Sequence, residues 1–124
     1  MTTRRELLLL STAALAASPL RAQTAAPIRI GEINSYSTIP QFTVPYRMGW
    51  QLAVEEANAG GGLLGRKVEV ISRDDAGKPD DAIRLATELV SNEKVSLLAG
   101  TFLSNVGLAV AEFALRNKVL FVAA

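Results

Sequence analysis

The chain has 124 residues, of which 49% are hydrophobic and 20% charged, a composition that is ordinary for a globular protein. It contains no histidine and no cysteine, which excludes zinc sites built from them, thiol nucleophiles, histidine-based triads and disulfides. The net charge is only +1 and no basic cluster stands out, so nucleic acid is not expected as a partner.

Residues 1–22 have the layout of a bacterial signal peptide. A pair of arginines precedes a short apolar run, and a proline and a small residue follow this run before Gln23. The run is too short for a membrane anchor, and it is apolar all round rather than amphipathic, which disfavours a structural helix. We therefore predict export to the periplasm by the Sec or the twin-arginine pathway, with a short linker at residues 23–27.

Strands and helices are predicted to alternate from residue 28 onwards. Short apolar and β-branched runs indicate four strands, and amphipathic segments between them indicate three helices. The predicted strands are residues 28–33, 67–73, 95–99 and 119–122, and the predicted helices are residues 45–59, 79–90 and 104–117.

The boundaries of the first predicted helix depend on proline and glycine. Pro45 suits the first turn of a helix, so residues 34–44 are predicted to be a long polar and aromatic loop. Three consecutive glycines, residues 60–62, end the helix, because the left-handed conformation of a helix end costs glycine little. Trp50 lies within the helix and is assigned to the core.

Alternation of strands and helices predicts an α/β fold with a parallel sheet between two helical layers, a three-layer α/β/α arrangement. If the strand order is 2-1-3-4, the switch point lies between the first and third strands. The chain stops at Ala124 directly after a strand, whereas a fold of this type usually continues with a loop and a helix. We therefore expect residues 28–124 to be part of a longer domain.

Ligands of open α/β sheets bind beyond the carboxyl ends of the strands, near the switch point. Three loops are predicted at that edge, at residues 34–44, 74–78 and 100–103. The first and the last of these follow the two strands on either side of the switch point. We therefore expect them to converge and to form the mouth of a binding site.

Several side chains of these loops are candidates for ligand contact. The helix that begins near Ser104 has free backbone N–H groups in its first turn, which attract an anion such as a carboxylate. Thr101 and Ser104 can either cap this helix or bond a ligand, and capping is the favoured reading. Tyr36 and Phe42 lie in the predicted mouth loop, where contact with a ligand and packing within the protein are equally open.

Other chemistries find little support in the sequence. The first strand is not followed by a glycine-rich turn, and no phosphate-binding loop is present, which argues against a dinucleotide or nucleotide site. Asp74 and Asp75 could bind Mg²⁺ as a carboxylate pair, but hydrogen bonding within the turn is the favoured reading. We predict no catalytic residue, no metal and no cofactor.

The residues described so far resemble a known family. The segments PIRIGEI, LAVEEANAGGGLLGRKVEVISRDDAGKPDDAIRLATELV and VSLLAGTFLSNVGLAVAEFALRNKVLFV resemble substrate-binding proteins of ABC importers. More specifically, they are similar to the branched-chain amino acid (Leu/Ile/Val) binding family, which has the type I periplasmic binding protein fold. The resemblance extends from about Ile28 to Val122, nearly the whole of the expected mature chain.

The resemblance implies a non-enzymatic function. Members of the family have two α/β lobes that close over a ligand, and this chain would be the first part of the amino-terminal lobe. It would bind an amino acid or other small carboxylate and deliver it to an ABC permease in the inner membrane. The alternative is a ligand-sensing receptor domain of the same fold, which a membrane or kinase segment elsewhere in the protein would favour.

The resemblance also implies the ligand-binding residues. Ser104 and the residues around it would hold the ligand carboxylate, and Phe42 would pack against the ligand. The full predicted set is Tyr36, Phe42, Gly100, Thr101, Phe102, Ser104 and Asn105. Residues 35–38 and 101–105 depart from the family pattern by adding bulk or aromatic surface at the mouth. These departures lead to the hypothesis of an aromatic or other less standard small carboxylate as the solute.

Overall fold

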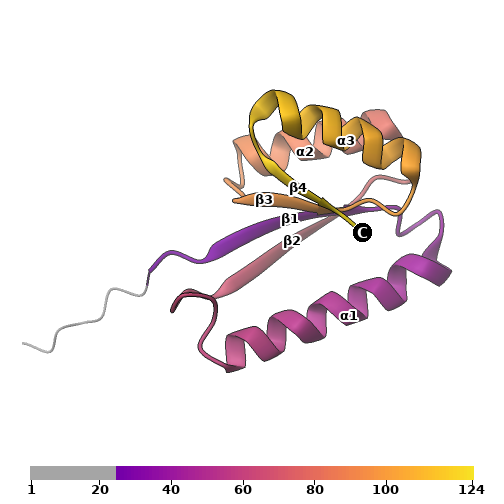
Figure 1. The fold of residues 1–124 in the computed structure, drawn as a ribbon. Helices are drawn as coiled ribbons and strands as arrows, with labels where there is room; N and C mark the ends of the chain where they lie inside the picture. Colours follow the sequence, from indigo (N-terminus) through magenta and orange to yellow (C-terminus); the bar gives the residue numbers. More distant parts are fainter. Residues whose placement is uncertain (1–24) are drawn as a thin grey trace, which may run out of the picture.

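The computed structural model describes residues 25–124, so the predicted signal peptide and the first two residues of the predicted linker lie outside the described residues. Strands and helices alternate along the described part, as predicted (Figure 1). They are β1 (Ile28–Asn34), α1 (Pro40–Ala59), β2 (Val68–Asp74), α2 (Pro79–Ser91), β3 (Leu97–Gly100), α3 (Ser104–Asn117) and β4 (Leu120–Ala123). Within residues 25–124, no helix is long and apolar enough to cross a membrane.

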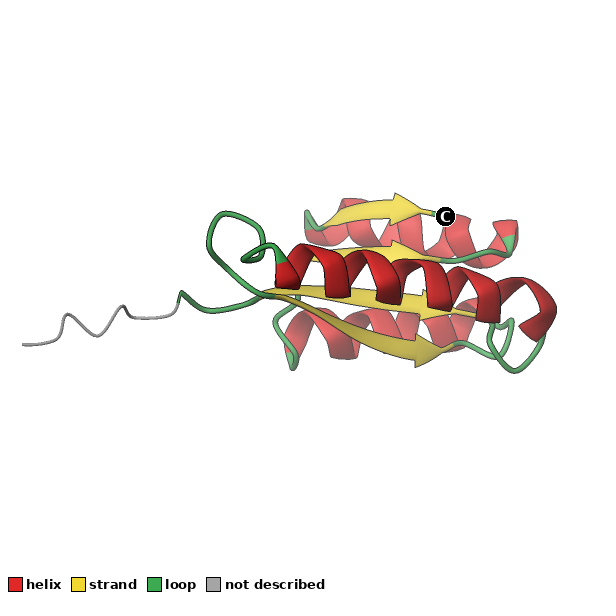
Figure 2. Ribbon diagram, turned by 90° about the horizontal axis from the view of Figure 1, so that it is seen from below, coloured by secondary structure: helices red, strands yellow, loops and turns green. Residues whose placement is uncertain are grey.

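The strands form one parallel sheet in the order β2-β1-β3-β4, the order on which the expected position of the switch point depended. Helix α1 lies on one face of the sheet, and α2 and α3 lie on the other, so the predicted three-layer arrangement is also confirmed (Figure 1). All four strands point towards the same edge (Figure 2). In the register of the sheet, Ile33 at the end of β1 lies beside Gly100 at the end of β3.

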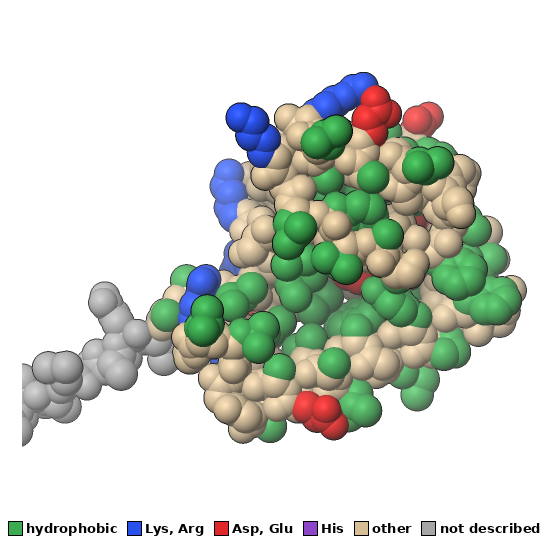
Figure 3. Space-filling model, in the orientation of Figure 1, with side chains coloured by type: hydrophobic (Ala, Val, Ile, Leu, Met, Phe, Trp, Pro, Cys, Tyr) green, Lys and Arg blue, Asp and Glu red, His purple; other side chains and the backbone are tan. Residues whose placement is uncertain are grey.

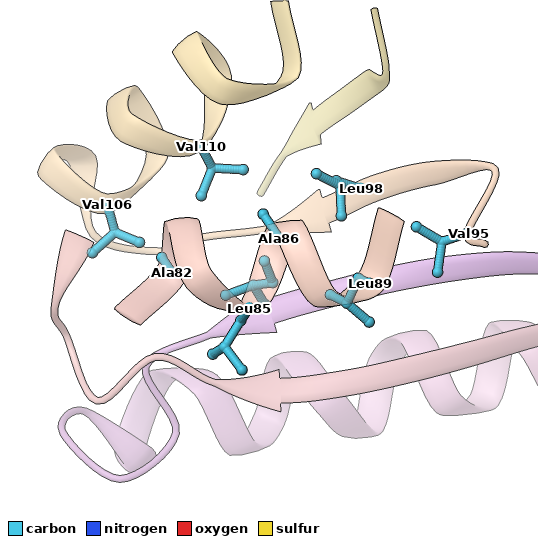
Figure 4. Packing of buried hydrophobic residues seen from close by; sticks show 9 residues of the cluster. Ala82, Leu85, Ala86, Leu89, Val95, Leu98, Val106 and Val110 are labelled. Carbon is cyan, nitrogen blue, oxygen red and sulfur yellow. The ribbon is translucent and has the colours of Figure 1, made fainter. Parts of the chain in front are cut away.

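The hydrophobic core lies between the sheet and the helices α2 and α3 (Figure 4). Helix α2 contributes a stripe that includes Ala82 and Ala86, whose small side chains permit close packing against α3. Leu89 and Leu98, from α2 and β3, are fully buried at its centre. Burial of each such leucine contributes roughly 1.5–3 kcal/mol, so this face supplies most of the hydrophobic stabilisation of the described part.

Helix α1 begins at Pro40, five residues before the predicted start at Pro45, so the predicted loop at residues 34–44 is shorter than expected. Both prolines suit a first turn, because the N–H groups of that turn have no partner within the helix. Pro40 takes this position, and the backbone N–H of Phe42 donates to the carbonyl of Ile39 at 3.1 Å. Phe42 therefore lies in the first turn of α1 rather than in a loop.

The face of the sheet beneath α1 is less completely covered. A groove of about 270 Å³ lies between the helix and the sheet, and the space-filling view shows a hollow lined by hydrophobic side chains there (Figure 3). Trp50 was expected in a closed core but is half-buried at the wall of this groove. Leu120 and Val122 of β4 are exposed, because α1 packs against the β2 side of the sheet.

A polar network crosses the α1 face of the sheet. Glu32 of β1 is only 2% exposed, and its carboxylate accepts hydrogen bonds from the hydroxyls of Tyr36 at 2.9 Å and Ser72 at 2.6 Å. The guanidinium of Arg47 lies 3.5 Å from the centre of the Tyr36 ring, and the indole N–H of Trp50 donates to the Tyr36 hydroxyl oxygen at 3.4 Å. Burial raises the pKa of Glu32, and the bonds from Ser72 and Tyr36 only partly offset this effect.

The raised pKa of Glu32 predicts a pH-dependent stability. The folded protein binds the Glu32 proton more tightly than the unfolded chain, so stability falls as the pH rises from the ordinary value of 4.5 through the folded pKa. We expect the thermal midpoint of Glu32→Gln to fall less than that of the wild type as the pH rises from about 4.5 to 7, as measured by circular dichroism. Glu69→Gln, at an exposed position of β2, should keep the wild-type slope. Equal slopes for wild type and Glu32→Gln would contradict the prediction.

Candidate functional site

The loops that follow β1 and β3 are joined at the carboxyl edge of the sheet. The backbone N–H of Thr101 donates to the carbonyl of Ile33 at 2.7 Å. The backbone N–H of Phe102 donates to the side-chain oxygen of Asn34 at 3.1 Å, across the gap between the two strands. The loops therefore converge at the switch point of the strand order, where α/β sheets bind their ligands.

Gly100 and Thr101 shape this edge through their backbone. Both have positive φ angles, +107° and +67°, and a Cβ atom on Gly100 would lie 2.3 Å from the carbonyl oxygen of Ile33. Thr101 is buried, and its hydroxyl donates to the carbonyl of Gly100 at 2.6 Å. These two residues direct the chain from β3 into α3, and the side chain of Thr101 faces the protein rather than the solvent.

The loop after β2 is held by its two aspartates. Asp75 is fully buried, and its Oδ1 accepts hydrogen bonds from the Ser35 hydroxyl at 2.6 Å and the Gly77 N–H at 2.7 Å. Burial raises the pKa of Asp74, but N–H donors from Ala76 and Ser37 outweigh this effect and lower it below its ordinary value. This is the turn hydrogen bonding that the sequence favoured over a Mg²⁺ pair. Among residues 25–124, no cluster of three or more potential ligands could hold a metal ion.

The amino-terminal end of α3 is open. Its N-cap is Leu103, and no side chain in the described part of the protein bonds to the free N–H groups of the first turn. The expected capping by Thr101 or Ser104 is therefore wrong, because the Thr101 hydroxyl is bonded to Gly100 and Ser104 is already the first residue of the helix. Ser104 and Asn105 are both exposed. A helix start of this kind provides N–H donors and a positive dipole end for an anion.

Two aromatic rings lie at the same edge. Phe42, from the first turn of α1, stacks on Phe102, from the loop before α3. The ring centroids are 5.1 Å apart and the planes differ by 11°. Phe42 is 53% exposed and Phe102 is 46% exposed, so the pair forms an aromatic surface open to solvent.

The structure sorts the predicted site residues into two groups. Phe42, Phe102, Ser104 and Asn105 are exposed at the carboxyl edge, whereas the predicted contact residues Gly100 and Thr101 are buried.

Tyr36 belongs to the buried group as well. It was a candidate at the mouth, but its ring is only 8% exposed and its hydroxyl donates to Glu32. Sequence reasoning missed Asn34, whose side-chain oxygen joins the loops after β1 and β3. An asparagine at the carboxyl end of a predicted strand beside the switch point was the available signal.

The chain is similar to proteins of a known family. The family described as "Periplasmic binding protein" matches residues 27–124. The Leu/Ile/Val-binding protein homolog 7 of Brucella suis is 36% identical over 109 residues, which cover 87% of this chain and 27% of that protein. The chain therefore spans about a quarter of the length of this relative.

Solved structures of substrate-binding proteins also superpose on this chain. The substrate-binding protein of a branched-chain amino acid transporter from Streptococcus pneumoniae, in complex with isoleucine, superposes with a TM-score of 0.71 and 31% identity. A solute-binding protein of an ABC transporter from Rhodopseudomonas palustris, in complex with 3,4-dihydroxybenzoic acid, superposes with a TM-score of 0.65 and 31% identity. The matches cover 78% and 79% of this chain, but 28% and 26% of the two structures. Because the family model covers residues 27–124 and the parallel α/β fold matches these structures, the chain belongs to the periplasmic binding protein family.

Proposed function

We propose that this chain is part of the extracytoplasmic solute-binding component of an ABC importer. Residues 28–124 would form the first part of its amino-terminal lobe, and the component would deliver its solute to a permease in the inner membrane without enzymatic activity. The family match over residues 27–124 supports the proposal, and the signal-peptide pattern of residues 1–22 supports export to the periplasm.

The solute in this proposal is an amino acid or another small carboxylate. The observation that carries it is the open start of α3, which lies at the switch point with exposed Ser104 and Asn105. The two structural relatives described above contain isoleucine and 3,4-dihydroxybenzoic acid, and both of these ligands have a carboxylate. An anion at this position would accept N–H hydrogen bonds from the helix and one O–H bond from Ser104.

A calorimetric titration of the exported protein tests this proposal. We expect binding of small carboxylates, with isoleucine and benzoate as probes, and no binding of isoleucinamide or benzamide, which lack the carboxylate. Replacement of Ser104 by alanine should weaken carboxylate binding by about tenfold or more, because a hydrogen bond to a charged group is lost. Ser91→Ala, at the exposed end of α2, should leave binding unchanged. Equal binding of acids and amides, or no binding of any carboxylate, would contradict the proposal.

A further inference from the structure

The aromatic pair at the carboxyl edge carries an inference about the kind of solute. We propose that Phe42 and Phe102 determine specificity and favour a carboxylate attached to a planar aromatic ring over one with an aliphatic side chain. The inference rests on the proposed function, because it assumes that a small carboxylate binds at this edge. It concerns the part of the solute that the open helix start does not contact.

Exposure of the two rings is the first observation. The rings come from different elements, α1 and the loop after β3, and about half of each lies open to solvent. Exposed apolar surface has no stabilising value for the described part, and an exposed patch beside polar groups is typical of a ligand contact. The neighbouring exposed side chains, Ser104 and Asn105, are polar.

The position of Phe102 is determined by its backbone. Its N–H donates to the side-chain oxygen of Asn34, and the preceding residue Thr101 is held with a positive φ angle by its bond to Ile33. A non-glycine residue in this conformation is uncommon and persists only where surrounding contacts impose it. The loop therefore fixes the backbone of Phe102 and the stack on Phe42 orients its ring before any ligand arrives, which reduces the entropic cost of binding.

The stacking geometry limits how a solute can use the pair. At a centroid separation of 5.1 Å and an angle of 11°, the rings are in contact and leave no space for a third ring between them. A solute can therefore only extend the stack on an outer face or pack against a ring edge. A planar aromatic solute gains stacking as well as burial in both arrangements, whereas an aliphatic side chain gains burial alone.

A structural role is the competing explanation for the pair. Phe42 and Phe102 also connect the start of α1 to the loop before α3, and this contact alone would stabilise the edge. The two explanations differ in what they predict for binding. A purely structural contact lowers stability when it is removed but does not distinguish an aromatic solute from a saturated solute of the same size.

The test compares benzoate with cyclohexanecarboxylate, which share the carboxylate and the ring size but differ in aromaticity. Calorimetry on the exported protein should show about a tenfold preference for benzoate, the size expected for one stacking contact. The preference should be lost in Phe102→Leu and reduced in Phe42→Leu, since leucine keeps an apolar side chain without a π-system. Leu115→Ala, an exposed change on α3, should keep the preference.

The outcomes separate this inference from the proposed function. Equal affinity of the wild-type protein for both ring acids would overturn the inference, whether or not the variants fold. So would tight binding of isoleucine with no response to benzoate, although that result would support the proposed function. Absence of binding to any carboxylate would overturn the proposed function and this inference with it. Thermal midpoints of the leucine variants report any loss of stability separately from the change in preference.

Discussion

Replacement of Gly100 by alanine should destabilise the folded protein by about 3–4 kcal/mol. The new Cβ atom would lie 2.3 Å from the carbonyl oxygen of Ile33, and the φ angle of +107° is rarely accessible to an L-residue. The carbonyl of Ile33 also accepts the N–H of Thr101, so relief of the clash would break the bond that joins β1 to the loop after β3. Urea unfolding followed by circular dichroism measures the effect.

Gly49→Ala is a matched control for this change. Gly49 lies within α1, and a Cβ atom there meets no other atom within 4 Å. Alanine should stabilise the helix at this position by about 0.5–1 kcal/mol, because glycine loses more conformational entropy on folding. A similar effect of alanine at both glycines would show that the edge at Gly100 is not constrained as described.

Replacement of Asp75 by alanine should cost about 3 kcal/mol of folding stability. The change would leave the Ser35 hydroxyl and the Gly77 N–H without their acceptor and would create a small cavity at a fully buried position. Since Ser35 follows β1 and Gly77 precedes α2, the loops at two strand ends would loosen together. Calorimetric unfolding of the variant measures the loss.

Two further variants show whether the effect of Asp75 comes from its hydrogen bonds. Asp75→Asn keeps one acceptor oxygen and should cost less than Asp75→Ala. Asp81→Ala removes a partly exposed partner of Arg84, 3.4 Å away, and should change stability by less than about 0.5 kcal/mol. If Asp75→Ala were as mild as Asp81→Ala, the buried hydrogen bonds would not be stabilising the loop.

Both changes also bear on the binding edge. Gly100 positions the loop that carries Phe102. Asp75 holds Ser35 in the loop that leads from β1 into α1, and Phe42 lies in the first turn of this helix. If the Gly100→Ala or Asp75→Ala variant still folds, we expect it to bind its solute more weakly than the wild type, because the rings of Phe42 and Phe102 lose their relative placement.

The amino-acid sequence by itself determined the order and type of the elements along the chain and the parallel α/β class of the fold. Apolar strand runs alternate with amphipathic helices along the chain, and short returns between them permit only a parallel sheet with helices on both faces. Glycines at residues 60–62 end α1 as predicted, because backbone conformation at a helix end is a local property. The family resemblance drew on the same local segments.

The first residue of α1 could not be predicted from local sequence patterns. Pro40 and Pro45 fit a first helical turn equally well, and the choice between them depends on where the chain leaves β1. The burial of the Tyr36 side chain could not be predicted either, because its inward orientation depends on contacts with Glu32 of β1 and Arg47 of α1. Helix periodicity likewise could not distinguish whether Trp50 lines a groove or lies in a closed core.

Only the tertiary structure decided how the candidate site is assembled. The contact between Phe42 and Phe102 and the bond from Phe102 to Asn34 join residues that are far apart in the sequence. They exist because the register of the sheet places the ends of β1 and β3 side by side. Local patterns report which face of a strand or helix is buried, but the distances between elements follow from the packing of the whole sheet with its helices.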